Sequence, residues 1–297
     1  MQGKRKKELK QSLTAASFLA PSLLGLILFS AVPVVFSMFI SLTDWNYVNG
    51  IGNWNFVWFE NFKKLWSDEW FRAALRNTFV YTVVTVPIGL FLAVVIAVLI
   101  DQFCAKKLAG MLRVTMYMPK ICNIVASAAV WTMLYSTYGP FTQLMKALGW
   151  ADPPRFLASY TWALPAIMLM SIWQGLGYHV FLYSASLTSL PKDIYEAADL
   201  DGVNGIQRFF YITLPQLKPT TFFLTVTGII SSFKVFGSIN VMTHGGPGSS
   251  TYTLVYYIYK SAFTYYEMGY ASAVAMVLFA ILLCVTLYQW HHNKNND

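Results

Sequence analysis

The sequence predicts an all-α membrane protein, and its composition and its hydrophobic patterning both support that class. Hydrophobic residues make up 56% of the 297 residues, and the mean hydropathy is +0.49. Charged residues make up only 11%, against roughly 25% in an ordinary soluble domain. A soluble domain of this size still exposes about a quarter of its unfolded surface, so it could not hide so much apolar area. Uncharged stretches long enough for a transmembrane helix, about 20 residues, recur along the chain.

The density of apolar residues narrows these stretches to six predicted transmembrane helices. Their approximate bounds are 14–41, 77–100, 117–136, 161–187, 216–240 and 268–290. The first stretch is longer than the apolar part of a secretory signal, which is about 7–15 residues, and it follows the basic run Lys4-Arg5-Lys6-Lys7. We therefore expect an uncleaved first span, which Pro21 and Pro33 bend.

The distribution of positive charge predicts that both termini lie in the cytoplasm. Lys and Arg number 11 in the inner segments 1–13, 101–116, 188–215 and 291–297, and 7 in the outer segments 42–76, 137–160 and 241–267. Lys218, at the inner end of the fifth span, raises the inner number to 12, while Lys120 and Lys234 lie within spans. Cytoplasmic segments carry such an excess, so the net charge of +8 indicates topology and no nucleic acid is expected as a partner.

The outer segment 42–76 is rich in aromatic side chains. They are Trp45, Tyr47, Trp54, Phe56, Trp58, Phe59, Phe62, Trp66 and Trp70. Such rings favour the boundary between membrane and water, so we expect this segment to lie on the bilayer. A docking surface for a partner protein is the alternative.

The sequence lacks the motifs of common nucleotide, metal and nucleophile sites. It contains no G-x-x-x-x-G-K-[ST], H-E-x-x-H, C-x-x-C or G-x-S-x-G. Its four histidines and three cysteines do not have the spacing of metal ligands. Few carboxylates fall inside the predicted spans, which argues against a proton relay. We therefore expect no cofactor in this chain, and any energy for uphill transport should come from another protein.

The segment 190–215, which follows the fourth span, is predicted to form a short helix–turn–helix on the cytoplasmic side. Gly202 can take the left-handed conformation that ends a helix. Asn204 can cap a second short helix that carries Arg208, and Pro215 is expected to end that helix before the next span. An ordinary amphipathic loop packed on the bilayer is the alternative interpretation.

The residues of this segment closely resemble the EAA motif of binding-protein-dependent ABC importers. The matching residues are Glu196, Ala197, Ala198, Asp201, Gly202, Ile212, Leu214 and Pro215. In that family the segment is the coupling helix, which docks into a groove of an ATPase subunit. The resemblance implies that two partner ATPase subunits bind ATP and Mg, and that this chain is a permease and not an enzyme. The residues implied in coupling are Glu196, Ala197, Ala198, Asp201, Gly202, Arg208 and Pro215.

Other stretches are similar to the sugar-importing, maltose-permease-like branch of that family, in its compact six-span form. They are Phe18-Leu-Ala-Pro21, Ser41-Leu-Thr-Asp-Trp45, Asn77-Thr78 and Thr243-His-Gly-Gly-Pro-Gly-Ser-Ser-Thr251. The resemblance implies an ABC transporter transmembrane domain over residues 14–290, with 1–13 and 291–297 as cytoplasmic ends. It also implies a second permease subunit that forms a heterodimer, an extracytoplasmic binding protein that contacts the Gly-Gly-Pro stretch, and a place in the bacterial cytoplasmic membrane.

Polar and aromatic residues of the spans are the candidates for a sugar site. Aromatic faces stack on sugar rings and small polar groups hydrogen-bond to hydroxyls, and a transporter site is expected near the midplane of the bilayer. The candidates are Ser171, Trp173, Gln174, Gly175, Tyr178, Ser231, Ser232 and, more weakly, Asn123. All except Trp173 and Asn123 also match positions of the maltose-type site in the resembled family. His179 is expected to pack between helices, and the Trp and Tyr residues favour a neutral sugar.

The sequence therefore predicts the transmembrane permease subunit of an ABC importer for a sugar or oligosaccharide. An ion-coupled secondary transporter is the alternative, and it would require ionisable residues within the spans. A membrane enzyme is a third class, which the sequence disfavours because the spans contain no polar catalytic cluster.

Overall fold

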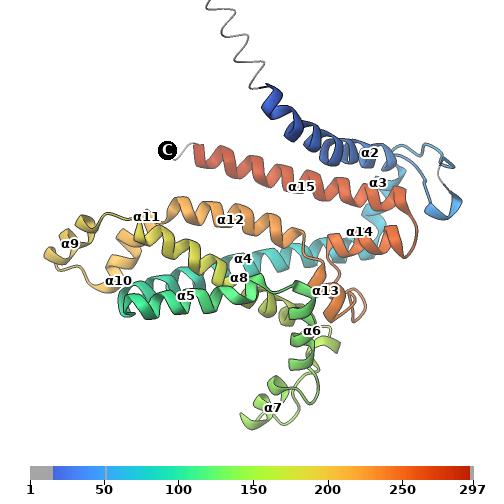
Figure 1. The fold of residues 1–297 in the computed structure, drawn as a ribbon. Helices are drawn as coiled ribbons and strands as arrows, with labels where there is room; N and C mark the ends of the chain where they lie inside the picture. The colour runs from blue at the N-terminus through green and yellow to red at the C-terminus, as the bar shows by residue number, and fades with distance from the viewer. Residues whose placement is uncertain (1–15, 51, 295–297) are drawn as a thin grey trace, which may run out of the picture. The chain divides into compact units, whose positions relative to one another are not determined.

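The computed structural model describes residues 16–50 and 52–294, which are largely helical (Figure 1). The chain divides into two compact units. Unit 1 comprises Met1–Ser67 and Ile258–Phe279, and unit 2 comprises Asp68–Tyr257 and Ala280–Asp297. Among the described residues, β pairing is limited to two isolated bridges in unit 1, Thr43 with Phe56 and Asn46 with Glu267.

Unit 2 contains the helices that carry the predicted functional residues. They are α4 (Glu69–Phe103), α5 (Lys106–Ile121), α6 (Ile124–Leu134), α7 (Pro140–Ala147), α8 (Ala163–Thr188), α9 (Lys192–Leu200), α10 (Gly205–Gln207), α11 (Leu214–Gln216), α12 (Lys218–Phe233) and α13 (Gly237–Met242), with a 3-10 turn η3 (Phe156–Ala158) and a π turn η4 (Arg208–Thr213). Unit 1 contains a π turn η1 (Ile27–Ala31), α2 (Val32–Ile40), a 3-10 turn η2 (Tyr47–Asn49) and α3 (Glu60–Ser67). The last two helices, α14 (Leu254–Phe263) and α15 (Met268–Lys294), lie partly in each unit.

Among the residues that the structure describes, four helical stretches are long and apolar enough to cross a membrane. They are Ala16–Ile40, Glu69–Phe103, Lys218–Met242 and Met268–His291, and they contain or overlap the first, second, fifth and sixth predicted spans. The stretch Lys218–Met242 comprises α12 and α13 with a short interruption between them. The predicted fourth span is also one helix, the 26-residue α8. It is less apolar because it carries Gln174 and His179.

The predicted third span, 117–136, differs from the structure. Helix α5 begins at Lys106, and the chain leaves helical geometry at Cys122 and Asn123 before α6 starts. The basic residues at 106, 107 and 113 concealed this early start, because charge-free length was the criterion for a span. Arg113 pairs with Asp101 at 3.6 Å, which joins α5 to the end of α4.

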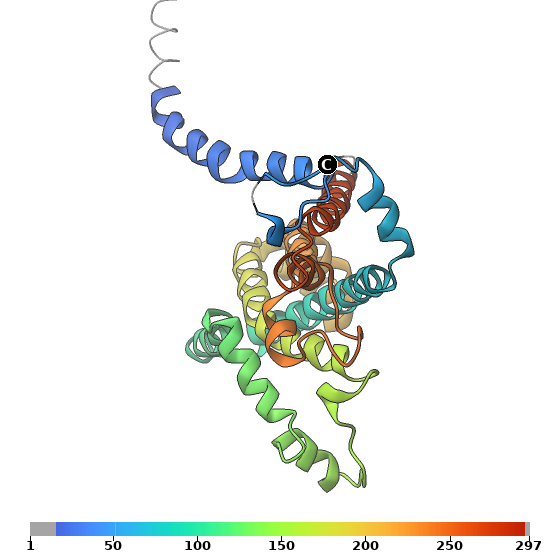
Figure 2. The same ribbon diagram turned by 90° about the vertical axis from the view of Figure 1, so that its right-hand side faces the viewer.

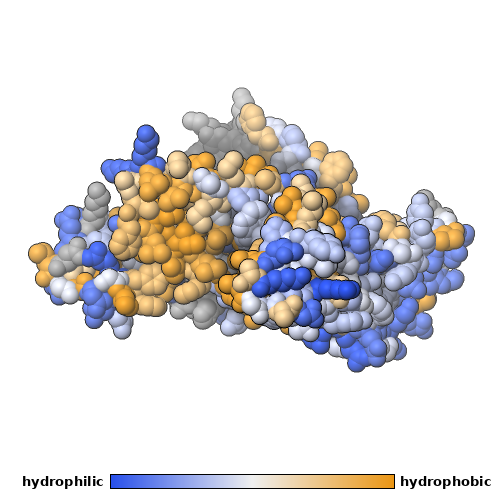
Figure 3. Space-filling view, turned by 90° about the horizontal axis from the view of Figure 1, so that it is seen from below, coloured by the Kyte–Doolittle hydropathy of each residue, from blue (hydrophilic) through white to orange (hydrophobic). Residues whose placement is uncertain are grey.

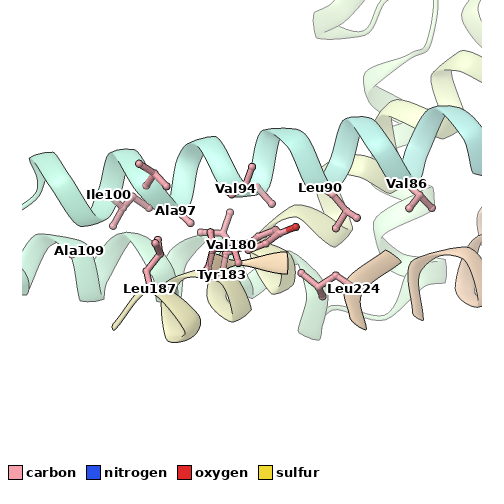
Figure 4. Close-up of a cluster of buried hydrophobic side chains, with 13 residues drawn as sticks. Val86, Leu90, Val94, Ala97, Ile100, Ala109, Val180, Tyr183, Leu187 and Leu224 are labelled. Carbon is pink, nitrogen blue, oxygen red and sulfur yellow. The ribbon is translucent and has the colours of Figure 1, made fainter. Parts of the chain in front are cut away.

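The core of unit 2 forms where α8 packs against α4, α5 and α12 (Figure 4). The buried side chains of this core include Val86, Leu90, Val94, Ala97, Ile100, Ala109, Val180, Tyr183, Leu187 and Leu224. Helix α8 approaches the backbone of α5 so closely at Gly177 that an added Cβ would clash with the carbonyl oxygen of Met116. Small residues at helix interfaces allow this kind of approach within membranes.

Helices α6 and α7 extend away from the four packed helices of unit 2, as both ribbon views show (Figures 1 and 2). The segment α9–α11 lies at the other end of α8 and α12 (Figure 1). The sugar-site candidates and the predicted coupling segment are thus separated along the same pair of helices.

The part of the aromatic outer segment that belongs to unit 1 contains a hydrogen-bonded loop followed by α3. The Asn61 side chain donates to the carbonyl oxygens of Ser41, at 2.9 Å, and Thr43, at 2.8 Å. Asn55 donates to Asp44 from its backbone N–H, at 2.6 Å, and from its side chain, at 3.1 Å. Both hydrogen bonds lower the pKa of the Asp44 carboxyl group, and the bond from the Asn55 backbone has the larger effect.

Apolar side chains cover much of the surface. The face in Figure 3 shows a broad hydrophobic area bordered by hydrophilic residues. On the first helix, Phe18 and Phe29 are 82% and 83% exposed. Such surface is unfavourable in water but suits contact with lipid, as expected for a membrane protein.

The contact at Gly177 predicts that Gly177→Ala destabilises the protein. The added methyl group would push α8 away from α5, and overpacking of this kind costs about 1–3 kcal/mol. The melting temperature in detergent should therefore fall by several degrees. Gly110→Ala is the matched control, since an added Cβ at Gly110 meets nothing within 4 Å. Equal melting temperatures for both variants would contradict the close contact between α8 and α5 at Gly177.

Candidate functional site

A cavity of about 690 Å³ lies within unit 2. Its wall is built by α4, α5, α6, α8 and α12 and by the segment 234–238, which links α12 to α13. The lining residues are Tyr81, Thr85, Val86, Gly89, Lys120, Ile124, Ser171, Ile172, Gln174, Gly175, Tyr178, His179, Thr227, Gly228, Ser231, Ser232, Lys234, Val235, Phe236, Gly237 and Ser238.

The structure brings six of the eight predicted sugar-site residues to this wall. They are Ser171, Gln174, Gly175, Tyr178, Ser231 and Ser232. The other two are not among the lining residues. Trp173 packs on Trp131 with ring centroids 5.4 Å apart, and the Asn123 side chain accepts the Val125 backbone N–H at 2.8 Å and caps α6.

Two of the lining polar side chains also hold helices together. The Ser232 hydroxyl donates to Thr82 Oγ1 at 2.9 Å and joins α12 to α4. The Gln174 amide donates to Ser127 Oγ at 3.5 Å and joins α8 to α6. Ser231 is exposed, whereas Ser232 is only 7% exposed. These neighbours therefore differ in role, and Ser231 is the better placed to meet a solute.

The cavity lies where two predicted spans leave helical geometry. The α5–α6 path does so at Cys122 and Asn123, and the α12–α13 path does so between Lys234 and Phe236. These interruptions meet, because an added Cβ at Gly237 would lie 3.0 Å from Ile124 Cγ2. Interrupted spans expose backbone polar groups, which a transporter tolerates where they line a cavity.

The sequence interpretation missed the contribution of α4 to the cavity. Tyr81, Thr85 and Gly89 line it from this helix. These residues are four apart, which places them along one face of a helix, and they are polar or small within a largely apolar span. This stripe was the signal that could have identified them.

Further polar groups in the wall were not assigned to the site. Lys120 and Lys234 both line the cavity, although the sequence treated them only as lysines within spans. His179, expected to pack between helices, lines it too. Within the part of the chain that the structure describes, His179 Nδ1 and Ser238 Oγ are buried without a hydrogen-bond partner. The wall therefore has unused hydrogen-bonding capacity.

The predicted coupling segment is the helix–turn–helix that the sequence indicated. Gly202 follows α9 with a φ of +70°, the left-handed conformation expected there. The Asn204 side chain accepts the Gln207 N–H at 2.8 Å, and the Gln207 side chain accepts the Asn204 N–H at 3.2 Å. This reciprocal pair is a capping box that starts α10.

Pro215 does not end this helix, contrary to expectation. It lies in the first turn of α11, directly after the π turn η4. Proline lacks an N–H, so a local change of hydrogen bonding is needed for a helix to pass over it. The helical path is instead interrupted at Leu217, which is fully buried.

The segment presents several motif residues to the surroundings. Glu196, Ala197, Asp201 and Gly202 are exposed. Ala198 faces inward and is 5% exposed. The Tyr195 hydroxyl lies 3.2 Å from Thr213 Oγ1, which ties α9 to η4.

Helices α8 and α12 connect this segment to the cavity. The last lining residue of α8, His179, precedes the end of α8 at Thr188 by nine residues, or about 14 Å of helix. On α12 the same spacing separates Lys218 from Thr227. The Tyr183 hydroxyl donates to Thr221 Oγ1 at 3.0 Å and holds the two helices together.

The Gly-Gly-Pro stretch is anchored to α4 within unit 2. The buried Asn77 side chain donates to the carbonyl oxygens of Ser249, at 2.8 Å, and Tyr252, at 3.0 Å. The next residue, Thr78, accepts the Leu254 N–H at 3.0 Å. This explains structurally why Asn-Thr stands at this place in the second span.

The contrast between Ser231 and Ser232 predicts a difference in thiol labelling. In a background with Cys104, Cys122 and Cys284 replaced, Ser231→Cys should react with a small hydrophilic maleimide at least about tenfold faster than Ser232→Cys. The reason is the exposure of Ser231 and the burial of Ser232. Labelling is measured by mass spectrometry on the protein in detergent. Similar rates would mean that the cavity wall is not arranged as described.

The chain is similar in sequence and in fold to known ABC transporter proteins. The chain is 33% identical to "Probable ABC transporter permease protein YurN" of Bacillus subtilis (strain 168), over 92% of this chain and 93% of that protein. It is 30% identical to the lactose transport system permease protein LacF of Rhizobium radiobacter, over 92% of both. Its fold is similar, at a TM-score of 0.84, to a chain in the crystal structure of a bacterial ABC transporter involved in the import of the acidic polysaccharide alginate. That chain is 22% identical, and the match covers 98% of this chain and 99% of that one.

The family match covers most of the chain. Residues 61–294 match the family described as "Binding-protein-dependent transport system inner membrane component". This match contains the cavity and the α9–α11 segment. The chain therefore belongs to the family of binding-protein-dependent inner membrane components and is a multi-pass permease subunit of an ABC importer, not itself an enzyme.

Proposed function

We propose that the chain forms the translocation pathway for a sugar or oligosaccharide delivered by an extracytoplasmic binding protein. The observation that carries the proposal is the convergence of six predicted sugar-site residues on one cavity. Relatives named for lactose, for arabinooligosaccharides and for sulfoquinovosyl glycerol support this substrate class. Family membership also argues against the ion-coupled alternative, because ABC importers are driven by separate ATPase subunits.

The proposed topology has six spans and cytoplasmic ends. The long apolar helices supply four of them. The other two are α8 and the interrupted path from α5 into α6. The basic segment 1–13 would lie in the cytoplasm, but it lies outside the described residues.

The proposed complex contains this chain, a second permease subunit as a heterodimeric partner, two ATPase subunits and the binding protein. Segment 190–215 is the proposed coupling segment. Its surface suits contact with a soluble protein, since Leu200 and Ile206 are 89% and 74% exposed beside the exposed motif residues. The Gly-Gly-Pro stretch is the proposed contact for the binding protein.

In this mechanism, closure of the ATPase dimer moves the coupling segment of each permease. Helices α8 and α12 carry that movement to the cavity wall, because both begin or end at the segment and both line the cavity. The pathway then changes between inward-facing and outward-facing states by rigid-body rearrangement around one site. A binding screen on the partner binding protein identifies the sugar, and the reconstituted complex should then import it only with ATP.

The topology can be tested with single cysteines in the background without native cysteines. Asn204→Cys should be labelled from the cytoplasmic side of the membrane, and Gly149→Cys from the opposite side. Both positions are exposed, so a difference reports sidedness and not burial. The measurement uses an impermeant maleimide on intact and on permeabilised spheroplasts. Labelling of both from the same side would overturn the proposed arrangement.

The coupling assignment predicts that Gly202→Asp uncouples ATP hydrolysis from transport. An added Cβ at Gly202 would meet nothing within 4 Å among the described residues beyond its chain neighbours, so we expect the effect to come from docking and from the strain of a positive φ. ATP-dependent uptake should fall at least about tenfold, while insertion into the membrane is retained. Replacement of Glu196 by Ala should act in the same direction.

Gly149→Asp is the matched control. Gly149 also has a positive φ, +91°, and open space around it, but it lies on the proposed outer side. It carries the same backbone strain without the contact to the ATPase. Normal transport by Gly202→Asp, or an equal loss in both variants, would show that the segment is not the coupling element.

A further inference from the structure

The ammonium groups of two lysines belong to the wall of the cavity, and no carboxylate does. Lys120 and Lys234 are among the lining residues, and Asp and Glu are not. Neither Lys120 nor Lys234 forms an ion pair with another residue in the part of the chain that the structure describes. The cavity therefore carries positive charge that the described residues of this chain do not neutralise.

Each lysine lies at the carboxyl end of a helix. Lys120 lies in the last turn of α5, and Lys234 is the residue that follows α12. The last carbonyl groups of a helix carry partial negative charge, which stabilises a nearby cation. Lys120 Nζ also lies 5.7 Å from the centre of the Tyr178 ring, within range of a cation–π contact. The helix ends, and the exposure of both lysines to solvent, explain how the wall holds two cations without a carboxylate.

Snorkelling toward the membrane surface is the simpler interpretation of a lysine in a span. The structure does not favour it here. The helical path continues as α6 beyond Lys120 and as α13 beyond Lys234, so neither residue is at the end of its path. Both side chains line the same cavity, at the level where the two paths are interrupted.

We infer that the cavity selects a sugar that carries a negatively charged group, such as a carboxylate or a phosphate, which Lys120 and Lys234 bind. The inference rests on the proposed function and narrows its substrate class. It differs from the neutral sugar that the aromatic residues favoured, because the sequence did not place the lysines at the site. The free His179 Nδ1 and Ser238 Oγ supply hydrogen bonds suited to sugar hydroxyls.

Electrostatics decides between a neutral and an anionic substrate. A neutral sugar that displaces water from the cavity leaves two ammonium groups less well solvated, which is unfavourable. An anionic group replaces the lost hydration with charge-assisted hydrogen bonds, which are stronger than neutral ones. The preference should therefore weaken at high salt, as the attraction is screened.

The test measures protection of a cysteine in the cavity, with the assembled transporter in detergent. Ser231→Cys is the reporter, and its labelling rate with a maleimide is measured with and without each sugar. The probes are two matched pairs: trigalacturonate against galactotriose for a carboxylate, and glucose 6-phosphate against glucose for a phosphate. Each rate is divided by the rate without sugar in the same variant, so changes in thiol reactivity cancel.

The expected result is half-protection at an about tenfold lower concentration for the anionic member of at least one pair. The pair that shows it identifies the charged group. The difference should shrink in 0.5 M NaCl and disappear in the double variant Lys120→Gln, Lys234→Gln. It should persist in Lys146→Gln, since Lys146 is also in the last turn of a helix, α7, but does not line the cavity.

Two other outcomes would overturn the inference and can be told apart. Equal protection by neutral and anionic sugars, unchanged in the double lysine variant, would refute selection by charge and leave the proposed sugar pathway standing. Protection by none of the four sugars would refute both the inference and the assignment of this cavity as the sugar site.

Discussion

The close approach of α8 to the backbone of α5 at Gly177 positions the functional part of unit 2. A side chain there would clash with the Met116 carbonyl oxygen, so the two helices meet as they do only because residue 177 has none. This contact sets α5 against the same helix that carries Gln174 and Tyr178 into the cavity. It also brings Lys120 within cation–π distance of Tyr178. The close packing of α8 on the backbone of α5 therefore sets the positions of the polar groups in the cavity wall.

The interruptions of two helical paths give the cavity its chemistry. A continuous apolar helix would turn only side chains toward a solute, since its backbone groups bond to one another. At Cys122 and at Lys234 the chain instead ends one helix and soon starts another, so helix ends meet the cavity. The carboxyl ends stabilise cations, which allows lysines where an apolar span could not hold them without a partner. The broken helices thus place two exposed lysines on the wall of the cavity.

Local features were predictable from the sequence, whereas contacts between distant segments were not. The left-handed Gly202 and the cap at Asn204 follow from residue type and near neighbours, and the structure shows both. The start of α5 was missed because its basic residues interrupt the charge-free length, and the sequence did not show that Arg113 pairs with Asp101 of α4. Lys120 and Lys234 were missed because the sequence does not show that two residues so far apart line the same cavity. Trp173 and Asn123 were chosen by residue type, but packing on Trp131 and capping of α6 use their side chains elsewhere.

The connections around the α9–α11 segment are very short. Three residues separate Thr188, where α8 ends, from Lys192, where α9 begins, and Leu217 alone separates α11 from α12. A movement of one segment reaches its neighbour only when the connection between them is short or stiff. These two connections are short enough to transmit it. On the proposed assignment, a variant with flexible glycine linkers inserted at these two connections would still dock its ATPase and still bind its sugar. Docking and sugar binding would no longer be coupled to each other. The length of each connection, and not only its residues, then determines whether the two sites are coupled.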